Sequence, residues 1–210
     1  MTEKKFSSLQ AVAGPVSRET FERLEFFEAA FRRWAGQINL VAPSTLPNLW
    51  ERHILDSAQL LPLAPEAVRW LDIGSGGGFP GAIEAILLAE RLGARADLVE
   101  SSRKKAAFLQ TTLATLKAPA TIHANRIEDC FDSIATPDVV TARALAPLPR
   151  LFSLAAPWLE RGATGLFHKG RDYLREVEES RDVWDFDLVE HPTKVGNDGV
   201  ILAVKGLHRR

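Results

Sequence analysis

The chain has 210 residues, of which 46% are hydrophobic and 25% are charged, with a formal net charge of −1 at pH 7. This balance fits one globular domain with a small appendage, and it excludes an intrinsically disordered chain and a protein that coats nucleic acid non-specifically. We also expect no membrane span, because no run of about eighteen apolar residues occurs, and no secretory signal, while the single Cys130 fits a reducing cytoplasm.

The first third of the chain is predicted to be helical. One helix is expected to begin at Ser17 as its N-cap, and a second is expected after Pro47. Prolines in the stretch "LPLAPEA" should end the second helix near Leu63. Apolar residues recur at helical spacing along the first helix, at Phe21, Leu24, Phe27, Phe31 and Trp34. We therefore predict an N-terminal helical extension over residues 1–66, packed onto a second unit over residues 67–210.

From Val68 onward, apolar strand patterns alternate with helical patterns. Such alternation predicts an α/β fold with a parallel sheet covered on both faces. The chain then ends in two strand patterns around Asn197, Asp198 and Gly199, which predict a hairpin that adds an antiparallel strand. The segments expected as strands are "VRWLDIG", "ADLVE", "ATIHAN", "PDVVTARA", "TGLFHKG", "DFDLVEHPTKV" and "VILAVKG"; those expected as helices lie near residues 81–92, 103–117, 147–159 and 171–184.

A glycine-rich loop, "GSGGGFPG" at residues 74–81, follows the first predicted strand and precedes a helix. Gly76, Gly78 and Gly81 match the spacing of the dinucleotide-binding fingerprint, which is a weak signal when it stands alone. Glycines let the backbone turn tightly and approach a ligand where a Cβ atom would clash. Because open α/β sheets bind ligands beyond the carboxyl ends of their strands, we predict a binding site at this loop.

Two acidic residues indicate which ligand the loop holds. Asp72 ends the first strand, where a carboxylate would repel a pyrophosphate but suit the amino group or sulfonium of S-adenosylmethionine. Glu100 ends the second strand, where an acid can accept hydrogen bonds from both ribose hydroxyls. The ribose contact is equally expected in NAD-binding folds, so it is the pair of acids that favours S-adenosylmethionine.

Motifs along almost the whole chain closely resemble those of the bacterial small-subunit ribosomal RNA guanine-N7 methyltransferases, once called glucose-inhibited division protein B. The most specific are the glycine loop with its Phe-Pro-Gly ending and the upstream "RHILDS". The complete set, in chain order, is "INL" at 38–40, "ERHILDS" at 51–57, "DIGSGGGFPG" at 72–81, "ES" with "RKKAAFL" up to 109, "RIE" at 126–128, "TARA" at 141–144 and "KG" at 169–170.

The resemblance implies a Rossmann-like, seven-stranded S-adenosylmethionine-dependent methyltransferase fold with an N-terminal helical extension. It also implies methyl transfer from S-adenosylmethionine to N7 of a guanine in the 530 loop of 16S ribosomal RNA. By position, it assigns cofactor contacts to Gly74, Phe79, Ile127, Glu128 and Arg143, and the ribose-binding acid to Glu100. Together with Asp72 and Gly76 from the strand end and the loop, these residues form the predicted cofactor site.

Methylation at guanine N7 fits the residues that the sequence offers. N7 carries an in-plane lone pair and no proton, so an aligned approach to the methyl group needs no general base. No acid–base pair is assigned, and Cys130 lacks the setting of a nucleophilic thiol. Arg143 and Lys169 are the candidate positioning residues, since both end predicted strands; Arg143 could contact guanine, phosphate or cofactor, and Lys169 an RNA phosphate.

Two other functions remain open from the residues themselves: an NAD-dependent Rossmann oxidoreductase, and a non-catalytic RNA-binding protein with the same fold. In the helical region, Arg52 and Asp56 could form an ion pair on a helix surface, while His53 and Ser57 could cap the cofactor pocket. No metal site is expected, because the histidines are dispersed. The expected partner is 16S ribosomal RNA or the small ribosomal subunit, with no membrane and no obligate protein partner, and the expected location is cytoplasmic.

Overall fold

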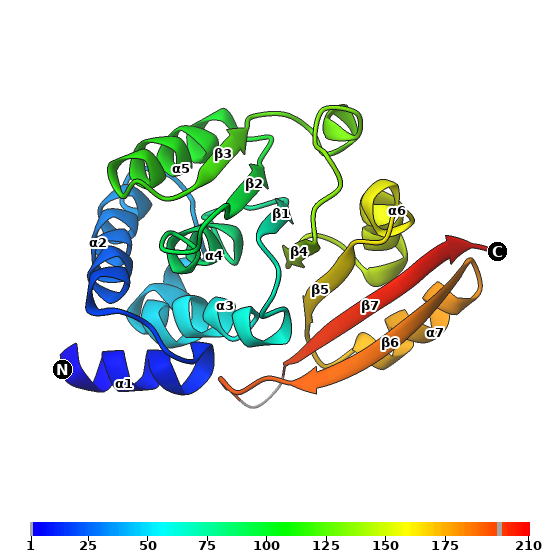
Figure 1. Ribbon diagram of the computed structural model, residues 1–210, viewed down its shortest axis with the longest axis horizontal. Coiled ribbons are helices and arrows are strands. Elements are labelled where there is room, and N and C mark those ends of the chain that lie inside the picture. The colour runs from blue at the N-terminus through cyan, green and yellow to red at the C-terminus, as the bar shows by residue number, and fades with distance from the viewer. Residues whose placement is uncertain (1, 197–198) are drawn as a thin grey trace.

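The computed structural model describes residues 2–196 and 199–210. They form a seven-stranded sheet in the order β3-β2-β1-β4-β5-β7-β6 (Figure 1). β1 to β5 pair in parallel, and β7 runs antiparallel to both β5 and β6. The strands are β1 (Arg69–Ile73), β2 (Arg95–Val99), β3 (Ala120–His123), β4 (Val139–Arg143), β5 (Thr164–Lys169), β6 (Trp184–Pro192) and β7 (Val200–Arg209).

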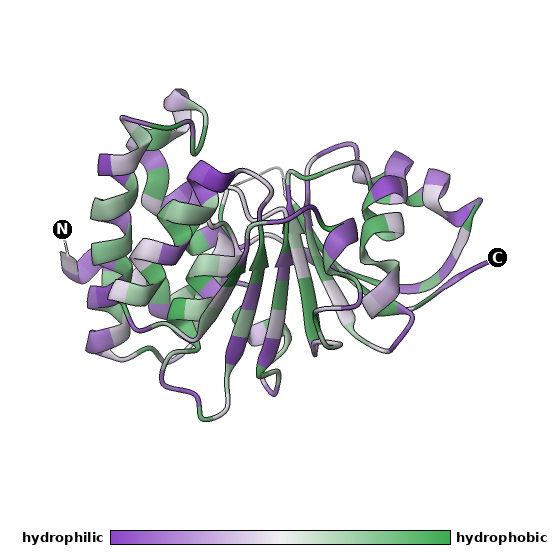
Figure 2. Ribbon diagram, turned by 90° about the horizontal axis from the view of Figure 1, so that it is seen from above, coloured by the Kyte–Doolittle hydropathy of each residue, from purple (hydrophilic) through white to green (hydrophobic). Residues whose placement is uncertain are grey.

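Helices cover both faces of the sheet. Figure 2 shows the strands between two helical layers, with α1 to α5 on one side and α6 and α7 on the other. The α-helices are α1 (Thr2–Ala13), α2 (Arg18–Ala35), α3 (Asp56–Ala58), α4 (Gly81–Leu87), α5 (Arg103–Thr115), α6 (Leu148–Leu159) and α7 (Tyr173–Arg181). The predicted α/β class is confirmed, with a seven-stranded Rossmann-like sheet that helices cover on both faces.

The strands divide their side chains between two apolar clusters. In β1, Trp70 packs with the cluster under α1 to α5, whereas Leu71 and Ile73 pack with the cluster under α6 and α7. In β2, Leu98 packs with the cluster under α1 to α5, and Val99 packs with the cluster under α6 and α7. This is the period-two alternation of a strand that is buried on both faces, and it explains why these segments are almost continuously apolar.

The predicted helix after Ser17 is present, and the Ser17 side chain caps it by accepting a hydrogen bond from the amide of Thr20 at 3.0 Å. The predicted second helix is wrong as a regular α-helix. The chain instead forms 3-10 turns over Pro43–Asn48 and Leu61–Leu63, a π-helical segment over Trp50–Leu55, and the short α3. Prolines inside the 3-10 segments remove amide donors, which breaks the regular ladder.

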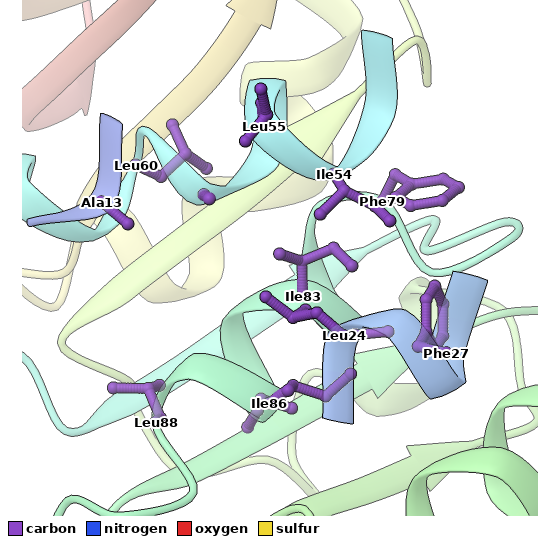
Figure 3. Close-up of a cluster of buried hydrophobic side chains, with 14 of the residues drawn as sticks. Ala13, Leu24, Phe27, Ile54, Leu55, Leu60, Phe79, Ile83, Ile86 and Leu88 are labelled. Carbon is purple, nitrogen blue, oxygen red and sulfur yellow. The ribbon is translucent and has the colours of Figure 1, made fainter. Parts of the chain in front are cut away.

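Helix α1 has no counterpart among the predicted elements. Its apolar residues Phe6, Leu9, Val12 and Ala13 lie on one face and are buried in the same cluster as α2 and α4. Figure 3 shows part of this cluster, where Ala13 lies near Leu60 and Leu24 of α2 lies beside Ile83 and Ile86 of α4. The N-terminal helices therefore complete the core on one face of the sheet.

The predicted closing hairpin is confirmed in its two strands, because β6 and β7 pair antiparallel over most of their length. The turn residues Asn197 and Asp198 lie outside the described residues. Across 2–196 and 199–210, no helix has the length and apolarity needed to cross a bilayer.

Candidate functional site

The glycine loop is anchored to the end of the neighbouring strand. The amides of Gly74 and Ser75 both donate to the carbonyl of Val99 at 2.9 Å. Gly74, Gly76 and Gly78 have φ values of +71°, +56° and +99°, in the left-handed region that favours glycine. At Gly78 an added Cβ would lie 2.7 Å from the Cβ of Ala82, so a side chain there would clash as well as strain the backbone.

Glu100 connects the loop to the end of β2. Its Oε2 accepts a hydrogen bond from the amide of Gly76 at 2.8 Å, and its Oε1 accepts one from the amide of Ser102 at 2.7 Å. The residue is only 8% exposed. Each carboxylate oxygen can accept more than one hydrogen bond, so the fixed carboxylate keeps acceptor capacity for a ligand hydroxyl.

A cavity of about 630 Å³ opens at this edge of the sheet. That volume is within the range of small-molecule sites. An added Cβ at Gly76 would meet only the Gly74 carbonyl oxygen, at 3.9 Å, so the loop leaves open space for a ligand there. Seven of the eight residues predicted for the cofactor line this cavity: Gly74, Gly76, Phe79, Glu100, Ile127, Glu128 and Arg143.

The eighth predicted residue, Asp72, is not among the residues that line the cavity. Its Oδ1 accepts from the Thr141 hydroxyl at 2.8 Å, and its Oδ2 accepts from the amide of Gly81 at 3.2 Å. Burial raises the pKa of this carboxyl to about 6. The structure therefore places Asp72 beneath the loop, where it ties β1 to β4 and to the start of α4, and the electrostatic argument for its contact with the ligand does not apply.

Arg143, at the end of β4, joins the sheet to the "RHILDS" segment. Its Nη1 donates to Asp56 Oδ2 at 3.0 Å and to the carbonyl of Arg52 at 3.2 Å, and its Nη2 donates to Nδ1 of His53 at 2.6 Å. The guanidinium also lies 5.2 Å from the ring centroid of Phe79. The expected Arg52–Asp56 ion pair is not formed, because Asp56 pairs with Arg143 instead.

His53, which the sequence suggested could cap the cofactor pocket, lies in the cavity lining. Its ring stacks on Phe79 with centroids 5.0 Å apart. Burial and the Arg143 charge lower the pKa of His53 to about 4, so the ring is neutral near pH 7. Arginine can only donate, so Nδ1 is the acceptor and Nε2 carries the hydrogen. This buried Nε2 has no partner among residues 2–196 and 199–210.

The structure separates three other residues from the cavity. Lys169 is buried and pairs with Glu176 of α7, so its ammonium does not face solvent as an RNA phosphate contact would require. The Ser57 hydroxyl donates a hydrogen bond to the backbone carbonyl of His53, and Ser57 is not among the residues that line the cavity. Cys130 is a buried free thiol. Among the described residues, no group of His, Cys, Asp and Glu side chains could hold a metal ion.

Comparison with known sequences gives long matches. The family model described as "rRNA small subunit methyltransferase G" matches residues 20–198. A protein of that name from Chelativorans sp. (strain BNC1) is 66% identical over 209 residues, which cover 100% of both chains. Another of that name, from Brucella abortus (strain S19), is 59% identical over 206 residues, which cover 98% of this chain and 97% of the relative.

Solved structures match in fold at much lower sequence identity. The O-methyltransferase TomG from Streptomyces achromogenes, in complex with SAM, aligns with a TM-score of 0.57 at 20% identity, over 88% of this chain and 90% of that one. Cofactor-bound Rv0187 from MTB aligns with a TM-score of 0.57 at 16% identity, over 93% of this chain and 92% of that one. These similarities concern the fold alone.

Proposed function

This chain belongs to the rRNA small subunit methyltransferase G family, and we propose that it transfers a methyl group from S-adenosylmethionine to N7 of one guanine in the 530 loop of 16S ribosomal RNA. The observation that carries the proposal is the cavity at the carboxyl edge of the sheet, with the glycine loop on one side and the Glu100 carboxylate at its rim. A ribosomal RNA substrate places the reaction in the cytoplasm and makes 16S ribosomal RNA, or the small subunit that contains it, the partner.

The residues around the cavity fit S-adenosylmethionine, which when bound supplies an electrophilic methyl group on its sulfonium. Glu100 would accept hydrogen bonds from the ribose hydroxyls, since the loop amide of Gly76 fixes its position. Ile127 and Glu128 border the cavity beyond β3, where they would contact the adenine. At the other end, the buried Nε2–H of His53 lacks an acceptor among the described residues, and a carboxylate oxygen of the ligand would supply one.

The chain's own part in the reaction is positioning. Guanine N7 has no proton to lose, so the site needs no general base, and aligned approach supplies most of the acceleration. His53 is neutral near pH 7 and its Nδ1 is already engaged with Arg143, so it is not poised to accept a proton. Arg143 instead holds the cavity wall in place through its bonds to the segment that carries His53 and Asp56.

Two alternatives from the sequence find less support. An NAD-dependent oxidoreductase needs the glycine loop to face a pyrophosphate, whereas Pro80, which has no amide hydrogen, precedes α4, and the Oε2 of Glu100 engages the Gly76 amide. A non-catalytic RNA-binding protein has no need for an open cavity lined by seven residues at cofactor-contact positions. Neither alternative accounts for the family to which the chain belongs.

The test is methyl transfer in a purified system. Small ribosomal subunits lacking the modification are incubated with the protein and methyl-labelled S-adenosylmethionine, and 7-methylguanine is mapped by borohydride–aniline cleavage. We expect cleavage at a single guanine of the 530 loop. Label without cleavage at that guanine would overturn the assignment of the position, and no label with either subunits or naked 16S RNA would overturn the activity.

A variant with a blocked cavity provides a negative control for this experiment. Gly76→Arg places a long side chain where an added Cβ meets open space, and Gly93→Arg makes the same change at an exposed glycine with φ +75° and nothing within 4 Å. Both positions have positive φ, so both variants carry similar backbone strain. We expect Gly76→Arg to abolish labelling and Gly93→Arg to retain it.

A further inference from the structure

A second cavity, of about 460 Å³, lies beside the cofactor cavity at the same edge of the sheet. Arg143, Ala144 and Leu145 line both cavities and so form a shared wall. Ala144 has a φ of +53°, which is unusual for a residue other than glycine and turns the chain sharply after β4. Residue conformations of this kind concentrate at functional sites.

The lining of the second cavity contains a buried ion pair between Lys169 and Glu176. Lys169 Nζ donates to Glu176 Oε2 at 2.6 Å and to the carbonyl oxygen of Ala146 at 2.8 Å. The amide of Leu148 donates to the same Oε2 at 2.7 Å. The two side chains are only 8% and 19% exposed, respectively. The pair is therefore held rigidly by β5, α6 and α7.

This arrangement leaves one acceptor and one donor of the pair unused. Both hydrogen bonds to Glu176 end on Oε2, so Oε1 has no protein partner in the part of the chain that the structure describes. The Lys169 ammonium has three hydrogens, of which two are engaged. Glu176 and Lys169 both line the cavity, which thus presents an acceptor beside a donor.

We propose that the second cavity receives the target guanine base and that Glu176 and Lys169 read its Watson–Crick edge. That edge offers the N1 and N2 hydrogens as donors and O6 as an acceptor, which complement a free carboxylate oxygen and a free ammonium hydrogen. Enzymes that modify a base commonly take it out of its stack and recognise this edge in a pocket. The inference rests on the proposed function, because it assigns a place to that reaction's substrate.

The orientation agrees with attack by N7. In guanine, N1 and N2 lie on the side of the ring system opposite N7. A base whose N1 and N2 hydrogens face Glu176 therefore directs N7 away from that carboxylate, in a cavity that shares Arg143, Ala144 and Leu145 with the cofactor cavity. Adenine in the same pose would direct the N1 lone pair at the carboxylate and its amino group at the ammonium, so both contacts would be repulsive.

The same contacts argue against an RNA phosphate on Lys169. A phosphate would have to compete with the Glu176 carboxylate, whose Oε2 lies 2.6 Å from Nζ. Burying a second anion beside that carboxylate carries a large electrostatic cost. A neutral base avoids this cost and uses both members of the pair.

The test compares two enzymes on two substrates. Glu176→Gln keeps an oxygen for Lys169 and Leu148 but replaces the free acceptor by an amide donor. The substrates are small subunits whose target nucleotide is guanine or inosine, which lacks the N2 amino group. For the unmodified protein we expect inosine to be methylated about 10- to 100-fold more slowly at subsaturating substrate, the range for a hydrogen bond to a charged group.

For Glu176→Gln we expect guanine to be methylated about 100-fold more slowly and the guanine-to-inosine ratio to fall to about one. Glu179→Gln is the matched control, because Glu179 lies on the same helix, is half exposed and, among the described residues, forms an ion pair with Arg175 alone. Binding of S-adenosylhomocysteine should be unchanged in both variants, which shows that the fold is intact. This readout separates base recognition from a merely structural role.

Equal rates on guanine and inosine for the unmodified protein would overturn the inference while leaving the proposed function standing. A Glu176→Gln variant that retains the original ratio would do the same. If the unmodified protein methylates neither substrate, the proposed function itself fails and the inference fails with it.

Discussion

At the scale of single residues, Arg143 shows how one side chain joins the sheet to the N-terminal segment. Its guanidinium makes three directed hydrogen bonds and packs near Phe79, and its side chain is only 16% exposed. Lysine has the same charge but a compact ammonium that cannot reproduce this planar fork. The position therefore requires the shape of arginine as well as its charge.

Arg143→Lys is accordingly expected to weaken binding of S-adenosylhomocysteine about tenfold or more, equivalent to about 1.4 kcal/mol. The physical reason is that His53 and Asp56 lose the donors that hold them at the cavity. Calorimetric titration measures the effect, and Arg161→Lys, at an exposed position, serves as the control. Unchanged affinity in Arg143→Lys would show that the fork does not shape the cavity.

Glu84 is a second residue with a testable energetic role. It is 1% exposed, and both of its carboxyl oxygens are buried without a hydrogen-bond partner among the described residues. Burial, and then the nearby Asp72 carboxylate, raise the pKa of Glu84 well above its ordinary value. Between the ordinary and the raised pKa, the folded state holds a proton that the unfolded chain has released. The free energy of unfolding therefore falls as the pH rises through this interval.

Glu84→Met should stabilise the protein, because it removes a buried polar group that has no partner. We expect the melting temperature to rise by about 2–6 °C near pH 8 and by less near pH 5, where the carboxyl contributes a smaller penalty. Thermal denaturation at the two pH values measures this difference. A gain that is equal at both pH values, or a loss of stability, would show that Glu84 is not held protonated.

At the scale of elements, the glycine loop depends on close packing between β1 and α4. An added Cβ at Gly81 would lie 2.5 Å from the Cβ of Asp72, whereas one at Gly170 would meet nothing within 4 Å. Neither position has a positive φ, so the comparison isolates the steric effect. The absence of a side chain at Gly81 thus allows the first turn of α4 to rest on the end of β1.

Gly81→Ala should therefore lower the free energy of unfolding by about 1–3 kcal/mol, the usual cost of overpacking. Gly170→Ala should change it by less than about 0.5 kcal/mol, as is usual for exposed substitutions. Chemical denaturation of both variants measures the two values. Equal effects would mean that the loop and helix adjust to the extra carbon, and that the tight contact with Asp72 has no energetic consequence.

Most elements could be predicted from the sequence because each has a clear local pattern. The strands from β1 to β5 are short apolar runs, and α2 has both its Ser17 cap and its helical periodicity. The conformation of the segment from Pro43 to Leu63 could not be predicted in the same way. Its apolar spacing is that of an α-helix, whereas the π-helical turn that the structure shows depends on packing. Asp72 shows the same limit within the site: its position at a strand end was predictable, but its burial beneath the loop was not.

At the scale of the whole molecule, the N-terminal helices and the sheet share one apolar cluster. Phe6 of α1 packs edge-on against Phe21 of α2 at 5.2 Å, and Phe21 packs in turn against Trp50 at 5.6 Å. The division into residues 1–66 and 67–210 stays a prediction, while the aromatic contacts tie α1, α2 and the Trp50–Leu55 segment to one another. The α1 helix could have been predicted as well, because Phe6, Leu9, Val12 and Ala13 have helical spacing.

Leu9 tests whether α1 stabilises the whole fold. It is 0% exposed within this cluster, so Leu9→Ala should leave a cavity and cost about 3 kcal/mol, or about 6–12 °C in melting temperature. Leu92→Ala is the control, since Leu92 is 97% exposed and should show no measurable change. If the Leu9→Ala variant has the same melting temperature as the unmodified protein, α1 is dispensable for the core.

If the cavity beside the glycine loop holds S-adenosylmethionine, a crystal structure with S-adenosylhomocysteine should show that ligand bound there. We expect ribose hydroxyls on Glu100, adenine beside Ile127, and the amino-acid end near His53 and Arg143, with Asp72 out of contact. An empty cavity in crystals soaked with this ligand, or a dinucleotide pyrophosphate bound against the loop amides, would contradict this expectation.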